Sequence, residues 1–194
     1  MKKFVFALAA LFLFAACGWA DNKVEVIEYK CVVCDKTFFS FKGDDLMQRD
    51  INDNPKQYDK LYQLYDRGRH IEQCRNNFKY HKFDRRNTRS VTPYFINQNM
   101  SRFVIIKDGG AVNVSLWTWE CLVCRKNFYS FGDNLNIRAW YDQPNWLRNV
   151  KANRSIYKCR DEYIPGHVFK FKSKGSVSSQ NIANLLENIY FVKQ

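Results

Sequence analysis

The chain has 194 residues, and its 31 Lys and Arg against 19 Asp and Glu give a net charge of +12. An aromatic content of 16% and a hydrophobic content of 46% exclude an intrinsically disordered chain. The length suits one domain or two small ones, and no apolar run after the N-terminal segment is long enough to predict a transmembrane helix.

The first residues have the pattern of an export signal. Lys2 and Lys3 supply its positive start, and the apolar stretch 4–16 is too short to span a bilayer comfortably. Small residues near position 20 predict a signal peptide of residues 1–20. Alternatively, the residues before Cys17 resemble a bacterial lipobox, so that residues 1–16 are removed and Cys17 is lipidated. Both interpretations predict export to the periplasm or the cell exterior, the second with membrane anchoring through Cys17.

Strand-like sequence follows the export signal. Residues 24–29 and 38–41 are rich in β-branched and aromatic residues and predict two strands. Asp44 or Asp45 could cap a short helix, and the apolar spacing within residues 58–65 predicts another helix.

The next part of the chain predicts a linker, a hairpin and a helix. Residues 87–99 contain Thr, Ser, Pro and several Asn, which indicates a linker. Apolar runs at 103–107 and 111–119 flank a glycine-rich turn and predict a β-hairpin. Residues 175–194 predict a C-terminal helix capped by Ser178 or Ser179.

A segment around the first Cys-x-x-Cys motif recurs later in the chain. Residues 29–41 match residues 119–131, and a second block at 69–75 matches 154–160. Each copy then reaches a histidine in an aromatic setting. The predicted organisation is repeat one at 24–86, linker and hairpin start at 87–111, repeat two at 112–174, and the C-terminal helix at 175–194.

Each copy contains three cysteines and one histidine at copied spacing. Zn²⁺ prefers four tetrahedral ligands drawn from thiolate sulfur and imidazole nitrogen. The sequence therefore predicts two structural zinc sites, each with a Cys3His ligand set. Their predicted ligands are Cys31, Cys34, Cys74 and His81 in the first copy, and Cys121, Cys124, Cys159 and His167 in the second. His70 aligns with Ser155, so we expect it on the surface, outside this pattern.

The segment Tyr-x-Cys-x-x-Cys-x-Lys-x-Phe of the first copy resembles the knuckle of zinc ribbons and treble-clef fingers. The resemblance implies a β-hairpin that carries the knuckle and an aromatic residue that covers the metal, for which Phe38 and Phe128 are in place. It implies an α+β fold of two tandem zinc-ribbon-like units with short helices. The Cys-to-His spacing in both copies is wider than that class usually has.

Two other interpretations of the cysteines stay open. Export favours disulfides, although an odd number of cysteines in each copy prevents either copy from pairing all of its own. A thiol–disulfide redox protein is the other alternative. Reactive Cys-x-x-Cys motifs usually begin a helix, whereas strand-like residues 36–41 follow the motif here.

No motif of the mature chain indicates catalysis. Neither a Ser/His/Asp arrangement, nor a phosphate-binding glycine loop, nor paired glutamates are present. We therefore expect a non-catalytic, zinc-stabilised binding or scaffolding protein of the bacterial cell envelope. Its partner would be a protein or another envelope component. The basic run Lys170, Lys172 and Lys174 suits an anionic polymer or lipid surface, and export argues against nucleic acid.

Overall fold

The computed structural model describes residues 23–66, 69–75, 79–107, 114–132, 135, 147–156, 159 and 167–192. The predicted export signal at 1–20 and Cys17 lie outside these residues. The fold is α+β, strand-rich with a few short helices, as the sequence predicted. No helix within the described residues is long and apolar enough to cross a membrane.

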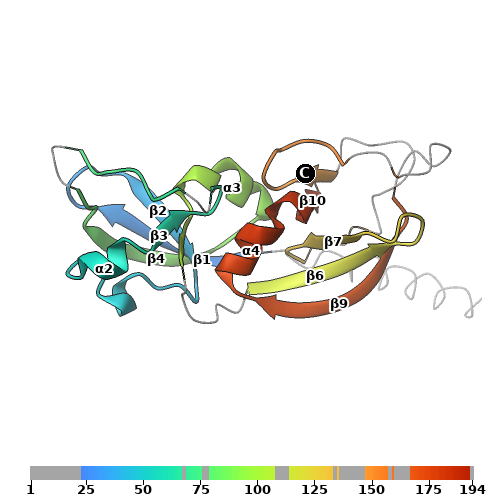
Figure 1. Ribbon diagram of the computed structural model, residues 1–194, viewed down its shortest axis with the longest axis horizontal. Helices are drawn as coiled ribbons and strands as arrows, with labels where there is room; N and C mark the ends of the chain where they lie inside the picture. Colours follow the sequence, from blue (N-terminus) through green and yellow to red (C-terminus); the bar gives the residue numbers. More distant parts are fainter. Residues whose placement is uncertain are drawn as a thin grey trace, which may run out of the picture.

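The first half contains two small antiparallel sheets (Figure 1). Strands β1 (Val24–Cys31), β2 (Thr37–Phe41) and β4 (Phe83–Val91) form one sheet in the order β2-β1-β4. Strands β3 (Leu61–Gln63) and β5 (Val104–Ile106) form the other. The helical elements are η1 (Met47–Arg49), α2 (Pro55–Tyr58), α3 (Pro93–Gln98) and η2 (Met100–Arg102).

The second half has the same kind of sheet arrangement. Its larger sheet has the order β7-β6-β9 and its smaller one pairs β10 with β8. Tyr29 pairs with Phe38 in the first half and Trp119 with Phe128 in the second, and both long strand pairs carry a bulge just before Tyr29 or Trp119. The elements are β6 (Val114–Cys121), β7 (Asn127–Ser130), β8 (Leu147–Asn149), β9 (Phe169–Val177), α4 (Ser179–Leu185), η4 (Leu186–Asn188) and β10 (Tyr190–Val192).

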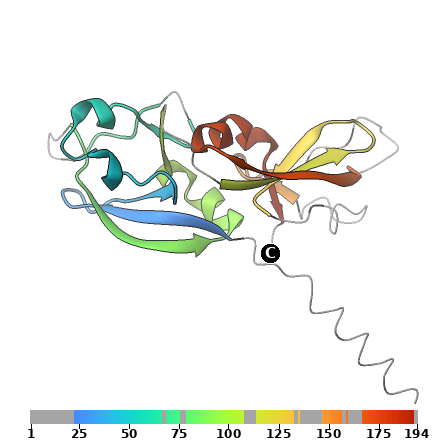
Figure 2. The same ribbon diagram turned by 90° about the horizontal axis from the view of Figure 1, so that it is seen from below.

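The largest hydrophobic core contains residues from both halves. Phe41, which is fully buried, packs on Phe103 of its own half and lies 6.3 Å from the Phe131 ring of the other half. Figures 1 and 2 show α3 and α4 where the two halves meet. Polar contacts cross the same junction, since Asn97 of α3 donates to the Val150 carbonyl at 2.7 Å. The halves are therefore joined by a common core rather than by a flexible connection.

Ser179, the first residue of α4, also joins the halves. Its hydroxyl donates to the carboxylate of Asp44, and both residues are buried. The neighbouring Asp45 accepts from the N–H of Met47, the first residue of η1. The N-cap position of η1 is Leu46, so neither Asp44 nor Asp45 is the N-cap that the sequence predicted. Asp45 also accepts from the buried Tyr29 hydroxyl at 2.9 Å.

The predicted linker and hairpin are both wrong. Residues 87–91 continue β4, whose side chains are polar because this edge strand is mostly exposed. Thr92 and Pro93 then begin α3, with Thr92 accepting from the Phe95 N–H. The apolar run at 104–106 pairs with β3, not with the run that forms β6. Strand-like sequence around a turn did not indicate which strands would pair.

Two predicted helices are shorter than expected. Ser178 caps α4 as predicted, by accepting from the Asn181 N–H, but the α-helix ends at Leu185. Residues Tyr190–Val192 form β10 instead, in keeping with the strand preference of aromatic and β-branched residues. In the first half, the predicted helix at 58–65 gives way to β3 after α2 ends at Tyr58.

Candidate metal centres

The first predicted ligand set converges at one point in the first half. Cys31 ends β1, Cys34 lies in the turn toward β2, and His81 precedes β4. The Sγ and imidazole nitrogen atoms of these residues and Cys74 all lie within 4.8 Å of one another. Three of the four residues are buried, and Cys34 is half-buried. We call this group the first centre.

The second predicted ligand set converges in the same way. Cys121 ends β6, Cys124 lies in the turn toward β7, and His167 precedes β9. Together with Cys159 they place four potential ligand atoms within 4.8 Å of one another. We call this group the second centre. Both Cys3His groups could hold a metal ion, and His70 is exposed and lies outside them, as predicted.

The spacing between the donor atoms fits a tetrahedral ion. With metal–sulfur and metal–nitrogen bonds of about 2.3 and 2.0–2.1 Å, a tetrahedron has S–S edges of about 3.8 Å and S–N edges of about 3.5 Å. The Sγ atoms are 3.8 Å apart in the pairs Cys31–Cys74 and Cys121–Cys159. The Sγ to Nδ1 distances are 3.4 Å for Cys34–His81 and 3.6 Å for Cys124–His167.

The same distances are unlike those of disulfides. A disulfide bond requires sulfur atoms about 2.05 Å apart. All six cysteines of the described residues are free thiols in this structure. The close approach of three sulfurs and one nitrogen in each centre is compatible with a metal ligand set.

Backbone hydrogen bonds shape each Cys-x-x-Cys turn. The N–H of Cys31 donates to the Lys36 carbonyl at 2.9 Å, and the N–H of Val32 donates to the Lys82 carbonyl at 2.9 Å. The second bond fastens the turn to the residue after His81, so it brings the two distant parts of the ligand set together. Leu122 and Val168 make the equivalent bond in the second centre, also at 2.9 Å.

The residue after the second cysteine of each motif has a left-handed backbone, with φ of 59° at Asp35 and 60° at Arg125. A side chain in this conformation costs about 1 kcal/mol that glycine avoids. We therefore expect Arg125→Gly to raise the free energy of unfolding by up to about 1 kcal/mol in a denaturant titration. The control is Arg125→Ala, which removes the same charge and keeps the strain. Equal stability of the two variants would contradict this account.

An aromatic ring covers each histidine. The Phe38 ring lies 4.7 Å from the His81 imidazole, and the Phe128 ring lies 4.6 Å from that of His167. These are the two aromatic residues that the zinc-knuckle resemblance singled out. The Nε2 atom of His81 is 2.8 Å from the Glu72 carbonyl, which can only accept, so Nε2 carries the hydrogen. Burial lowers the pKa of His81, which keeps the imidazole neutral near pH 7. Its Nδ1 lone pair is then available to a metal ion.

The thiols within each centre differ in acidity. Burial opposes ionisation of Cys31, but hydrogen bonds from N–H groups of its turn outweigh burial, and its pKa is lowered. The pKa of Cys121 is lowered for the same reasons. Burial raises the pKa of Cys74 to about 12 and also raises that of Cys124. A bound cation would supply the stabilisation that these last thiolates lack.

Two residues around the first centre were missed by the sequence reasoning. The Tyr58 hydroxyl accepts from the His81 N–H at 2.9 Å, and Tyr58 packs at 4.4 Å on the Tyr80 ring. Glu72 supplies a carbonyl to the histidine and a carboxylate to Lys36. Glu72 lies inside the second repeated block, two residues before Cys74, and that proximity was the available signal.

The fold and both centres define a strand-rich α+β protein with two potential Cys3His metal sites. Comparison with known proteins adds no closer relationship: no family model, no curated protein and no solved structure matches the chain.

Proposed function

We propose that the chain is an exported, non-catalytic binding or scaffolding protein of the bacterial cell envelope, stabilised by two structural Zn²⁺ ions. The observation that carries the proposal is the convergence, twice, of three sulfurs and one imidazole nitrogen within 4.8 Å of one another. In each centre one S–S and one S–N distance matches the edge of a zinc tetrahedron. Four protein ligands complete that coordination and leave no open position, which is the usual distinction between structural and catalytic zinc.

The donor types favour zinc over other common ions. Thiolates are soft ligands and select Zn²⁺ or iron–sulfur clusters, whereas Ca²⁺ and Mg²⁺ take oxygen ligands. When bound, zinc would supply cross-linking of strands that are distant in sequence. The chain's own contribution is to orient the donors through the knuckle hydrogen bonds and the Nε2–H bond of His81.

The paired architecture supports a tandem duplication of a zinc-ribbon-like unit. The two halves have matching strand orders and strand registers. This match supports two units that are longer than the repeats seen in the sequence, one from β1 through α3 to β5 and the other from β6 through α4 to β10. Thr92 and Ser178 cap equivalent helices, and the buried Ile96 and Ile182 follow at the same spacing. The knuckle hairpin in each unit supports the zinc-ribbon resemblance.

Export rests on the sequence of the first residues. We propose removal of residues 1–20, or of residues 1–16 with lipidation of Cys17, and a location in the periplasm or outside the cell. The exposed basic side chains of β9 support contact with an anionic envelope polymer or lipid surface, in addition to a protein partner.

Metal content and free thiols test this proposal directly. The mature chain would be isolated from the compartment to which it is exported, and zinc would be counted by elemental analysis. We expect about two zinc ions per chain and six titratable thiols after denaturation. No metal and no free thiols would contradict the proposal in favour of a disulfide-stabilised binding domain. A reversible dithiol couple with a potential near those of thioredoxin or protein disulfide isomerase would indicate a redox protein instead.

A further inference from the structure

A cavity of about 660 Å³ lies beside the second centre. Its wall includes Cys124 and His167, so this centre is in direct contact with the cavity. Apolar side chains form another part of the wall, namely those of Phe128, Ile156 and Tyr190. The volume is within the range of about 300–1,000 Å³ that is typical of small-molecule sites.

Positive charge dominates the polar part of the cavity wall. Among the residues that the structure describes, Lys126, Lys151 and Arg154 line it together with one carboxylate, that of Glu187. Lys151 forms an ion pair with Glu187, with 2.9 Å between the ammonium nitrogen and a carboxylate oxygen. No ion pair in the described part of the chain involves Lys126 or Arg154. A Zn²⁺ ion with three thiolates carries one negative charge, so the two cations still leave an excess of positive charge.

In the first centre, the lysine at the corresponding position is paired with a carboxylate. Lys36 occupies the position of Lys126, and its ammonium contacts the Glu72 carboxylate at 2.6 Å. The residue that aligns with Glu72 in the second half is Tyr157, which has no carboxylate to offer. The second half thus keeps the lysine of the pattern without the acidic partner that neutralises it in the first half.

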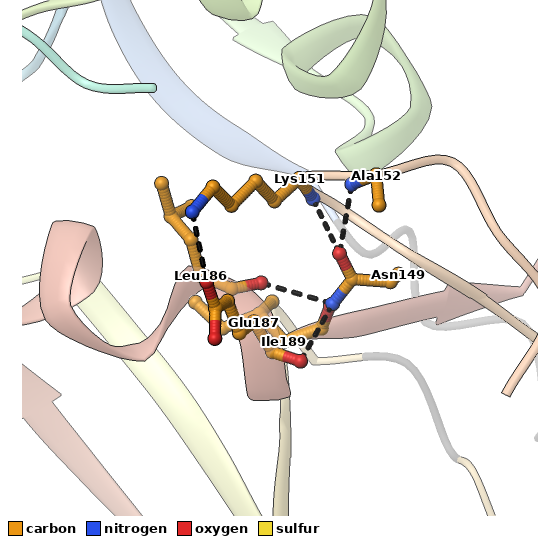
Figure 3. Close-up of polar contacts among 6 residues, drawn as sticks. All are labelled: Asn149, Lys151, Ala152, Leu186, Glu187 and Ile189. Carbon is orange, nitrogen blue, oxygen red and sulfur yellow. Dashed lines mark hydrogen bonds and ion pairs between the residues drawn. The ribbon is translucent and has the colours of Figure 1, made fainter. Parts of the chain in front are cut away.

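The loop that carries two of these cations is held in place by Asn149 (Figure 3). The Asn149 side-chain carbonyl accepts from the N–H groups of Lys151 and Ala152, at 2.9 and 2.8 Å. Its amide donates at 2.9–3.1 Å to three carbonyls, those of Leu186, Glu187 and Ile189. The Asn149 N–H donates to the Arg154 carbonyl at 2.8 Å. Because Asn149 is buried and uses all of these groups, the backbone that carries Lys151 and Arg154 is ordered before any ligand arrives.

We propose that this cavity binds a small aromatic anion, with its ring against Phe128, Ile156 and Tyr190 and its charged group toward Lys126 and Arg154. The apolar wall accounts for the ring, and Arg and Lys are the usual partners of phosphate and carboxylate groups. The inference deepens the proposed function and rests on it in one respect, since a bound metal would hold Cys124 and His167 in the wall.

Calorimetric titration of the mature chain with phenyl phosphate tests the proposal. We expect binding about tenfold tighter than that of phenol or inorganic phosphate, because each of these lacks one half of the recognised chemistry. Benzoate, titrated in parallel, shows whether a carboxylate serves as well as a phosphate. The double variant Lys126→Gln/Arg154→Gln should weaken phenyl phosphate binding at least about tenfold. The matched control is Lys56→Gln/Lys60→Gln, which removes the same charge from two first-half residues that do not line the cavity and should leave binding unchanged.

Zinc counted on the same samples separates this inference from the proposed function. Absence of phenyl phosphate binding by a chain with two zinc ions would overturn the inference alone. Equal weakening in both double variants would also overturn it, since the effect would then be that of net charge. Site-dependent binding by a chain without zinc would support the cavity and contradict the proposed metal. Absence of both binding and zinc would overturn both.

Discussion

Cys121→Ala is expected to reduce the bound zinc from two ions to one per chain. Cys121 is fully buried, and its Sγ lies 3.8 Å from that of Cys159. Alanine leaves three donors, and the described residues offer no fifth potential ligand at this point. An ion present at a thousand times its dissociation constant contributes about 4 kcal/mol to folding, so we expect a loss of at least that size in the free energy of unfolding.

Elemental analysis and denaturant titration measure both consequences. Cys31→Ala should also leave one zinc ion, but now in the second half, near Trp119. The control is His70→Ala, because His70 is an exposed histidine outside both centres and its removal should retain two ions. Two bound zinc ions in Cys121→Ala would contradict the ligand assignment of the second centre.

Phe41→Ala is expected to destabilise both halves together, although Phe41 belongs to the first. The ring is fully buried in the shared core and lies 5.5 Å from that of Phe103 and 6.3 Å from that of Phe131. Truncation of a buried phenylalanine costs about 3–5 kcal/mol through lost burial and the cavity that remains. Because the core is common to both halves, we expect one cooperative transition at a lower denaturant concentration.

Tryptophan fluorescence reports this effect from the other half of the molecule. All tryptophans after residue 20 lie beyond residue 113, and the buried Trp119 is in the second half. A shift of the tryptophan transition in Phe41→Ala therefore measures coupling between the halves. Phe171→Ala is the control, because Phe171 is 45% exposed and its truncation should cost much less. A tryptophan transition unchanged by Phe41→Ala would show that the halves unfold independently.

The grouping of the candidate ligands was more predictable than the strand pairing. Copied spacing in the chain identified Cys31, Cys34, Cys74 and His81 together with their counterparts, and the structure brings each set within 4.8 Å. Local composition could not identify the partner of residues 104–106, because their partners in β3 lie 41–45 residues earlier in the chain. The register of such a pair depends on which side chains become buried. Residues 87–91 were predicted as a linker because they are polar, but they belong to an edge strand whose side chains are mostly exposed.

The cavity and the shared core could not be predicted from motifs. No single sequence motif contains Lys126, Lys151 and Arg154 together. These residues line one cavity only because β8 and the second Cys-x-x-Cys turn lie close together in the fold. The proposed extension of the repeat through α3 and α4 was weakly indicated, since few residues besides the capping hydroxyls and Ile96 and Ile182 are shared. Packing across the two halves depends on shape, which the spacing of residues does not encode.

The separation of ligands along the chain has a consequence for the order of folding. Cys34 and His81 are 47 residues apart, and Cys124 and His167 are 43 apart. In a chain that is exported N-terminus first, the first donor set is complete once His81 has emerged, before Ile182 and Phe191 arrive to finish the common core. An ion captured at that moment would close a large chain loop and lower the entropy of the emerging polypeptide. Metal supply would then govern how long the first half stays exposed to aggregation and proteolysis.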